Sequence, residues 1–148
     1  DALFYAKRST IIDDSNYDHF ILYGRIASSL HLKSEAITAF EKAVKIKPDM
    51  FYNWMLLADE FIRNAYYRKA LFTLEEAVEY HNHSALLFFK LAAVHYIEKQ
   101  TRNAVKYFKK AMRIDPKHKK EFFKICPQAK KSKEISSLIE NASYKDQK

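Results

Sequence analysis

Few residues of this sequence stand at spacings that could support catalysis or metal binding. His81 and His83 flank one asparagine, and two imidazoles at this spacing can bind a transition metal. A metal site needs further ligands, and neither Asp49 nor Glu79 obviously converges on the pair. Cys126 is the only cysteine, and it falls in a column of small packing residues that recurs along the chain. We therefore expect a structural thiol and not a nucleophile.

Signatures of other enzyme chemistry are missing from the sequence as well. A chain with one glycine cannot form a glycine-rich phosphate-binding loop, and its serines, histidines and aspartates form no nucleophile elbow. His95 replaces an aromatic in a packing column, so we expect a core residue and not a general base. The prediction is that the chain is not an enzyme and holds no cofactor and no metal.

The composition predicts a globular helical chain with an uneven charge. Apolar residues make up 48% of the 148 residues and charged residues 30%, as in folded domains. One glycine and three prolines favour long helices joined by short turns. The net charge of +8 comes from residues 101–148, where 14 Lys and Arg stand against 5 Asp and Glu. This asymmetry is typical of contact with an acidic partner or nucleic acid, and also of a solvated lysine-rich surface.

Nothing in the sequence indicates a membrane span or a secretory signal. No apolar run approaches the roughly 18 residues that a spanning helix needs. A single cysteine allows no internal disulfide, so we expect a reducing, cytoplasmic location. The sequence opens at Asp1 without a methionine and inside an expected helix, so we expect a fragment of a longer parent chain.

A period of 34 residues organises the chain. Residues 17–50, 51–84 and 85–118 align without a gap. In the first half of each block, an aromatic is followed by a large residue and then by a small one; in the second half, two alanines flank a large residue. The columns hold Phe20, Trp54 and Phe88; Tyr23, Leu57 and Leu91; Gly24, Ala58 and Ala92; Ala36, Ala70 and Ala104; Phe40, Leu74 and Phe108; and Ala43, Ala77 and Ala111.

These columns predict two helices in each block. Apolar residues spaced by three and four form one stripe on a helix, and each block has two such stripes. The predicted helices span 17–30, 34–47, 51–64, 68–81, 85–98 and 102–114, with further helices at 1–12 and about 133–143. Gly24 should cost about 1 kcal/mol relative to alanine inside a helix, so we expect close helix packing at this position.

The columns resemble the tetratricopeptide repeat, whose pattern is W-x2-L-G-x2-Y, then A-x3-F, then P. The second block reads Trp54-x2-Leu57-Ala58-x2-Phe61, with an alanine and a large residue in the second half. The resemblance implies an all-α fold, a right-handed α-solenoid of helix–turn–helix repeats with a C-terminal capping helix pair. The predicted domains are a truncated preceding repeat at 1–16, repeats at 17–50, 51–84 and 85–118, and a degenerate capping repeat with a tail at 119–148.

The resemblance also implies that the first helices line a concave face. Residues of these helices that lie outside the packing columns would then form an apolar strip with a charged rim. The predicted groove residues are Ile21, Arg25, Tyr52, Met55, Asp59, Arg63, Leu86, Phe89, Lys90, Tyr96 and Phe123. Exposed apolar patches usually mark binding sites, so the predicted function is a scaffold or adaptor that binds a protein or peptide in this groove.

Three alternatives stay open at this point. The chain's own tail or a missing half-repeat can cover the strip. The chain can be an assembly or regulatory segment that packs within a larger multidomain parent. It can also be a basic nucleic-acid-associated repeat protein, because cations gather in its C-terminal third, although no base-stacking motif accompanies them.

Overall fold

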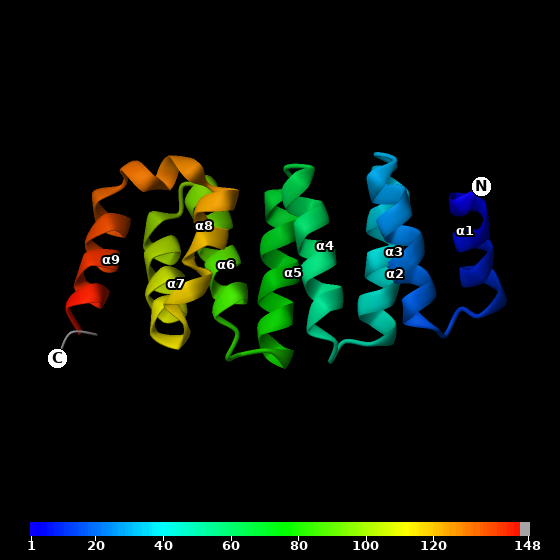
Figure 1. The fold of residues 1–148 in the computed structure, drawn as a ribbon, viewed down its shortest axis with the longest axis horizontal. Helices are drawn as coiled ribbons and strands as arrows, with labels where there is room; N and C mark the ends of the chain where they lie inside the picture. Colours follow the sequence, from blue (N-terminus) through cyan, green and yellow to red (C-terminus); the bar gives the residue numbers. More distant parts are fainter. Residues whose placement is uncertain (146–148) are drawn as a thin grey trace. The chain divides into compact units, whose positions relative to one another are not determined.

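The chain is all-helical in the computed structural model, which describes the backbone of residues 1–145 and the side chains of residues 1–141 (Figure 1). No strand occurs among these residues. The helices are α1 (Ala2–Ile12), α2 (Tyr17–Ser29), α3 (Lys33–Ile46), α4 (Phe51–Arg63), α5 (Tyr67–Tyr80), α6 (Ala85–Ile97), α7 (Thr101–Ile114), η1 (Pro116–His118), α8 (Lys119–Ile125), η2 (Pro127–Lys131) and α9 (Lys133–Lys145). The predicted helices agree with these bounds to within two residues.

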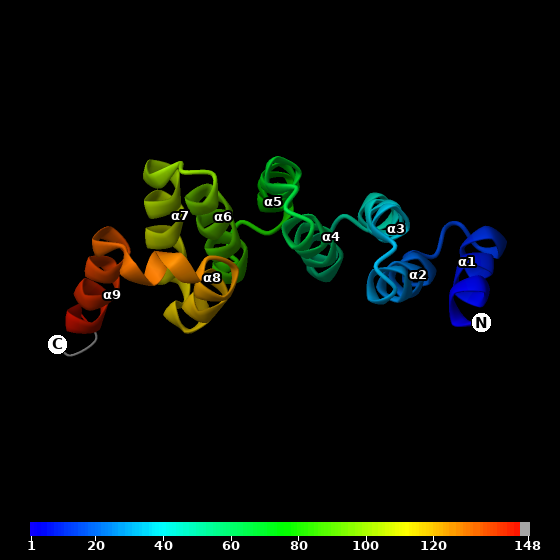
Figure 2. The ribbon, with the colours of Figure 1, turned by 90° about the horizontal axis from the view of Figure 1, so that it is seen from above.

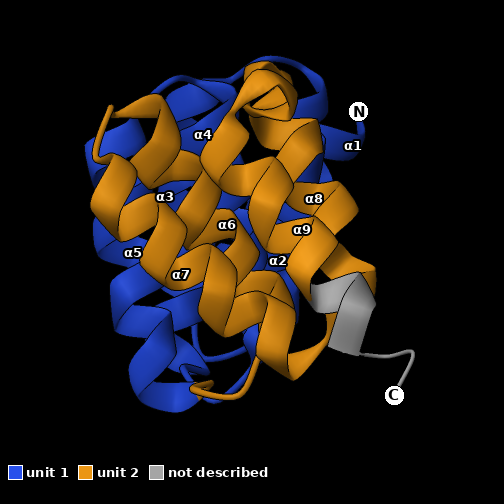
Figure 3. Ribbon diagram, turned by 90° about the vertical axis from the view of Figure 1, so that its left-hand side faces the viewer, with its two compact units in different colours: residues 1–80 blue, residues 81–148 orange. Residues whose placement is uncertain are grey.

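Two compact units make up the chain, residues 1–80 and residues 81–148 (Figure 3). In the first unit, each of the helices α1 to α5 packs against the next one along the chain, and α2 with α3 and α4 with α5 form side-by-side pairs (Figure 2). In the second unit, α6 packs against both α7 and α8, and α9 packs against α7. The predicted domain boundaries stay predictions, and residues 146–148 of the last one lie outside the described part.

Gly24 marks a close approach between the paired helices α2 and α3. A Cβ atom built on Gly24 would lie 2.5 Å from Cε1 of Phe40, a separation that real side chains do not adopt. The same column holds the fully buried Ala58 and Ala92 in the other two repeats. The predicted reason for this glycine, close helix packing, is confirmed.

The turn between the paired helices contains a left-handed residue that is not glycine. The φ angles are 58° at His31, 58° at Ala65 and 59° at Lys99, three positions spaced by 34 residues. In each turn the next N–H donates to a carbonyl five residues back: Leu32 to Ala27, Tyr66 to Phe61 and Gln100 to His95, at 2.8–2.9 Å. This is the Schellman arrangement that ends many helices. Sequence reasoning missed it because the usual signal is a glycine.

Two side chains of α4 secure the turn that connects it to α3. The fully buried Asn53 donates from Nδ2 to the carbonyls of Ala43 and Lys47, at 3.2 and 3.3 Å. Trp54 donates from Nε1 to the carbonyl of Pro48 at 2.6 Å. The Ala43 and Lys47 carbonyls also accept from the backbone N–H groups of Lys47 and Met50, so these side-chain bonds add to the backbone bonds and tie α4 to the end of α3.

The second unit is built around α6, which is buried along most of its length. Every residue from Leu87 to His95 is buried, because α7 and α8 cover different faces of this helix. Aromatic rings fill the space between the three helices: the Phe89 and Phe108 centroids lie 5.3 Å apart, and those of Phe108 and Phe122 lie 4.8 Å apart. A helix that is apolar on all sides belongs in a core, and α6 occupies that place.

His95 and Cys126 are both core residues, as the sequence predicts. The His95 ring stacks on Tyr107 with centroids 5.3 Å apart, and its Nδ1 lies 2.6 Å from Oε1 of Gln100. The Cys126 thiol is fully buried and donates to the Phe122 carbonyl at 3.2 Å. Burial raises the pKa of this thiol to about 12. Such a thiol stays protonated near neutral pH, so it is not an activated nucleophile.

The first helix leaves apolar side chains in water. Phe4 is 58% exposed, Tyr5 64%, Ile11 74% and Ile12 75%, while Ala6 is buried against α2 and α3. Only one narrow stripe of α1 therefore faces the protein, and the opposite side of the helix carries an apolar surface. None of the helices in the described residues is long and apolar enough to cross a membrane.

Candidate peptide-binding site

The predicted groove residues divide between the two units. In the first unit, Tyr52 is 50% exposed, Arg25 and Arg63 are exposed, and Ile21 and Asp59 are partly buried. Met55, however, is buried, with 6% of its surface exposed, because α4 buries three consecutive positions from Asn53 to Met55 and not one narrow stripe. The prediction that Met55 faces solvent is wrong.

In the second unit the prediction fails at two further residues. Phe89 is fully buried against Phe108, and Lys90 is only 5% exposed. Leu86, Tyr96 and Phe123 are partly buried, and Tyr96 and Phe123 lie edge-on to Phe122 at 6.2 and 5.1 Å. The cause is that α6 packs against both α7, which carries Phe108, and α8. Whether the remaining strip residues bind a partner stays a prediction.

In the first unit, the surface between the first helices α2 and α4, where the apolar strip was expected, holds a small polar cleft. Its volume is about 310 Å³, and it lies between α2 and α4 with Phe40 of α3 at its base. The buried Glu60 accepts hydrogen bonds from Oγ of Ser28 at 2.7 Å and from Nη1 of Arg63 at 2.8 Å. Arg63 is thus held by the protein itself, so this cleft offers few uncommitted groups to a peptide.

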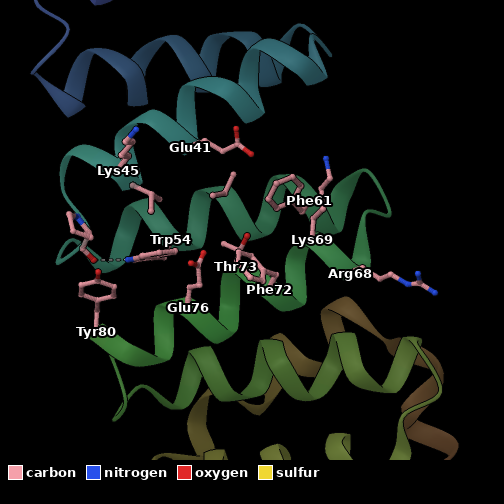
Figure 4. Close-up of a pocket in the computed structure, with 13 residues that line it drawn as sticks. Glu41, Lys45, Trp54, Phe61, Arg68, Lys69, Phe72, Thr73, Glu76 and Tyr80 are labelled. Atoms are coloured by element: carbon pink, nitrogen blue, oxygen red, sulfur yellow. Dashed lines mark hydrogen bonds between the residues drawn. The ribbon is translucent and has the colours of Figure 1, made fainter.

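A larger groove lies between α3 and α5 of the same unit, with α4 as its floor (Figure 4). We call it the α3–α5 groove; its volume is about 610 Å³. Its lining residues are Glu41, Val44 and Lys45 of α3 with Pro48 after it; Trp54, Leu57 and Phe61 of α4; and Arg68, Lys69, Phe72, Thr73, Glu76 and Tyr80 of α5. Such a concave, largely apolar surface with a few polar groups has the character of a ligand site.

Aromatic rings are concentrated in this groove. At one end, Trp54 and Tyr80 stack with centroids 5.7 Å apart and planes inclined by 29°, next to Pro48. Tyr80 is 54% exposed and Phe72 is 63% exposed, whereas Phe61 and Trp54 are buried in the floor. Aromatic side chains supply much of the free energy of protein interfaces. The two exposed rings, Phe72 and Tyr80, are therefore the feature of this groove that most favours binding.

Charged residues line the rest of the groove. Figure 4 shows Glu41 on the α3 wall and Glu76 on the α5 wall, with Arg68 and Lys69 near the beginning of α5. Among the described residues, neither carboxylate takes part in an ion pair or a hydrogen bond. The Lys69 ammonium lies over the rings of Phe61 and Tyr66, at 5.8 and 5.7 Å from their centroids. Two acidic groups on facing walls are therefore open to a cationic partner.

Sequence reasoning missed this groove because it searched only the first helix of each repeat. Phe72 and Tyr80 lie outside the packing columns of α5, which hold Ala70, Leu74 and Ala77. The off-column argument that selected Tyr52 on α4 applies equally to these two residues. Among the described residues, no group of three or more His, Cys, Asp or Glu side chains could hold a metal ion.

The chain was compared with known families, proteins and structures. A family model described as tetratricopeptide repeat matches residues 20–50 and 85–118. A search of curated protein sequences gave no match. A crystal structure of MamA superposes on 98% of this chain and 86% of that chain, with a TM-score of 0.73 at 16% identity. MamA from Desulfovibrio magneticus RS-1 gives a TM-score of 0.71 at 18% identity, over 98% of this chain and 84% of that chain.

A third structure, YrrB, is described as a TPR protein with an unusual peptide-binding site. It superposes with a TM-score of 0.69 at 17% identity, over 95% of this chain and 74% of that chain. At such identities, the structural likeness establishes the fold alone. The predicted all-α fold of helix–turn–helix repeats is confirmed by the helices and by these neighbours. The family match over residues 20–50 and 85–118, the repeated columns and the fold agree, and the chain contains tetratricopeptide repeats.

Proposed function

We propose that the chain is a protein-interaction module that takes a peptide segment of its partner into the α3–α5 groove. The exposed aromatic pair Phe72 and Tyr80 in the wall of a 610 Å³ groove is the observation that carries this proposal. Apolar side chains that line a concave surface lose water when a peptide covers them, which favours binding. The tetratricopeptide fold and the peptide-binding site named for YrrB support the same class of function.

The groove also suggests which peptide it binds. An apolar or aromatic side chain fits the end formed by Pro48, Trp54 and Tyr80. A lysine or arginine further along the peptide would lie between Glu41 and Glu76, whose carboxylates have no cation partner among the described residues. Ion pairs at a partly exposed site give modest affinity but strong selection between partners of opposite charge. The preferred ligand is a short extended segment with an apolar anchor and a basic residue.

The test begins with peptides that the whole chain selects from a displayed library. The sole tryptophan, Trp54, lies in the groove floor, so its fluorescence should change when a selected peptide binds. Replacing Phe72 and Tyr80 together by alanine should weaken binding by roughly tenfold or more, since the loss of a single aromatic hot spot costs about 2 kcal/mol and about 1.4 kcal/mol corresponds to a factor of ten. Circular dichroism should show an unchanged helix content, because both side chains lie largely in water.

Tyr52→Ala is the matched control, because Tyr52 is an equally exposed aromatic on α4 that belongs to the predicted inner strip. The proposal expects this variant to bind like the unchanged chain. If Tyr52→Ala abolishes binding while the Phe72 and Tyr80 double variant binds normally, the peptide sits on the inner face and the α3–α5 groove is not its site.

A further inference from the structure

The exposed face of α7 is a continuous row of cations. Five of the fourteen residues of this helix are basic and none is acidic. All five side chains are exposed to solvent: Arg102, Lys106, Lys109, Lys110 and Arg113. The stripe lies in the second unit, which makes it independent of the α3–α5 groove in the first unit. We call this row the α7 stripe.

Helix geometry aligns most of the α7 stripe. Arg102, Lys106 and Lys109 are spaced by four and three residues, and Arg113 comes four residues later, so all four lie along one side of the helix. At 1.5 Å of rise per residue, the row is about 16 Å long. The same residues line a shallow surface concavity of about 600 Å³ together with Val105.

The protein itself does not neutralise this row. Among the described residues, none of the five cations forms an ion pair. Lys110 lies over the Phe88 ring at 4.0 Å and Lys106 over the Tyr107 ring at 5.5 Å, which orients these two ammonium groups without cancelling their charge. Like charges three and four residues apart destabilise a helix by a few tenths of a kcal/mol per pair. An anionic partner would remove this repulsion.

The surroundings of the α7 stripe distinguish between anionic partners. Single-stranded nucleic acid needs exposed aromatic faces on which bases stack. The aromatics here are already occupied: Tyr107 is stacked on Phe88 and His95, and Phe88 is fully buried. Val105 adds an apolar side chain to the concavity, and a phosphate backbone has no apolar group to match it. An acidic amphipathic helix provides both carboxylates and apolar side chains.

We propose that the α7 stripe docks an acidic amphipathic segment of a partner protein, with carboxylates along the row of cations and an apolar side chain against Val105. This surface is a second contact, separate from the α3–α5 groove.

The test uses the full chain and fluorescence anisotropy of a labelled helical peptide. This peptide carries glutamates at positions i, i+4, i+7 and i+11 and leucines at i+3 and i+10; a second peptide has the same composition in scrambled order. We expect the ordered peptide to bind more tightly than the scrambled one. We also expect its affinity to fall as salt is raised from about 50 to about 200 mM. The double variant Lys109→Glu with Arg113→Glu should lose roughly tenfold or more in affinity.

The charge-matched control is Lys130→Glu with Lys131→Glu, two exposed lysines of η2 in the same unit. It should bind the ordered peptide within about twofold of the unchanged chain. Equal losses in both double variants would overturn the proposal, because the effect would then come from net charge alone. Equal binding of ordered and scrambled peptides would overturn it too. Tighter binding of an oligonucleotide, lost in the Lys109 and Arg113 variant, would assign the stripe to nucleic acid instead.

If the α3–α5 groove proves not to bind a peptide, the proposal for the α7 stripe is unaffected. The proposal for the groove is likewise independent of the outcome for the α7 stripe. The Phe72 and Tyr80 double variant serves as a further control here, since both side chains belong to the first unit. It should bind the acidic peptide normally.

Discussion

At the scale of single residues, the turns within the repeats contain backbone strain that cannot be predicted from the sequence. His31, Ala65 and Lys99 adopt left-handed φ angles, which cost a residue with a Cβ atom about 1 kcal/mol or more relative to glycine. Such a cost persists only when the surrounding structure fixes the turn. Here the Schellman hydrogen bonds at the helix ends do so. The repeats therefore tolerate three non-glycine residues at a conformation that favours glycine.

We expect Ala65→Gly to stabilise the chain by about 0.5–1 kcal/mol, because the strain is released while the turn keeps its hydrogen bonds. Urea unfolding followed by circular dichroism measures the change. The control is Lys45→Gly on the exposed side of α3, where a glycine inside a helix should destabilise by about 1 kcal/mol. A destabilised Ala65→Gly variant would contradict the presence of strain at this turn.

The buried thiol gives a prediction on chemical reactivity. Burial raises the pKa of Cys126 to about 12 from the ordinary value of 9.0. Since only the thiolate reacts, the folded chain should resist alkylation by iodoacetamide at about pH 8, whereas the urea-unfolded chain should react rapidly. Mass spectrometry of the two samples measures this difference. Equal rates in both samples would mean that Cys126 is accessible in the folded state.

The same pKa shift predicts how Cys126 affects stability at different pH values. The folded chain holds the thiol neutral, so the contribution of Cys126 to stability is fully present below the unfolded pKa of 9.0. It is lost as the pH rises from there towards about 12, because the unfolded chain ionises first.

At the scale of helices, the α3–α5 groove depends on acidic residues from two different elements. Replacing both Glu41 and Glu76 by glutamine keeps their size and removes their charge. We expect the affinity for a selected basic peptide to fall by about three- to tenfold, and the affinity for a neutral analogue of that peptide to stay the same. Titration of Trp54 fluorescence measures both affinities.

The control for this pair is the double variant Glu75→Gln with Glu79→Gln, two exposed acids of α5 that do not line the groove. It changes the net charge by the same amount. If it weakens basic-peptide binding as much as the Glu41 and Glu76 variant does, the groove carboxylates have no specific role.

Helix positions were predictable to within two residues because the 34-residue register fixes many boundaries at once. Exposure was less predictable, and α6 shows why. Its sequence from Ala85 to Ile97 has one charged residue, Lys90, so apolar residues surround the helix on all sides. That pattern indicates a helix buried by more than one neighbour, yet the repeat resemblance alone leaves one face open. Phe89 and Lys90 are buried because α6 packs against both α7 and α8, and the repeat columns do not specify which further residues of α6 these two neighbours cover.

The candidate site was also only partly predictable from the sequence. The strip on the first helices could be predicted from residues outside the packing columns, but the groove between α3 and α5 depends on how neighbouring repeats are spaced. Asn53 and Trp54 donate hydrogen bonds to carbonyls at and just after the end of α3, and these bonds help to set the spacing. No pattern in a single sequence predicts such bonds. Phe72 and Tyr80 only become a site once α3 lies opposite them.

At the scale of the whole molecule, the two units differ in how many of their large side chains are fully buried. Of the largest side chains that are fully buried, all but Leu74 and Asn53 belong to the second unit. Stability in repeat proteins is distributed unevenly along the chain, and regions with few buried contacts open first. We therefore expect the slowest amide exchange in α6 and the fastest in α1.

Hydrogen exchange followed by mass spectrometry of peptic fragments measures this gradient. Fragments from α4 should show intermediate protection, since seven of its residues are buried and Asn53 ties it to α3. Uniform protection from α1 to α7 would mean that the chain opens as one cooperative body.

The uncovered side of α1 has a practical consequence for solution work on this chain. Phe4, Tyr5, Ile11 and Ile12 expose apolar surface to water, and two such helices brought together would each shed part of that solvation cost. We therefore expect self-association at high protein concentration to compete with such titrations. Affinities are best measured with the chain dilute and the peptide in excess, and Ile11→Lys with Ile12→Lys provides a more soluble background for them.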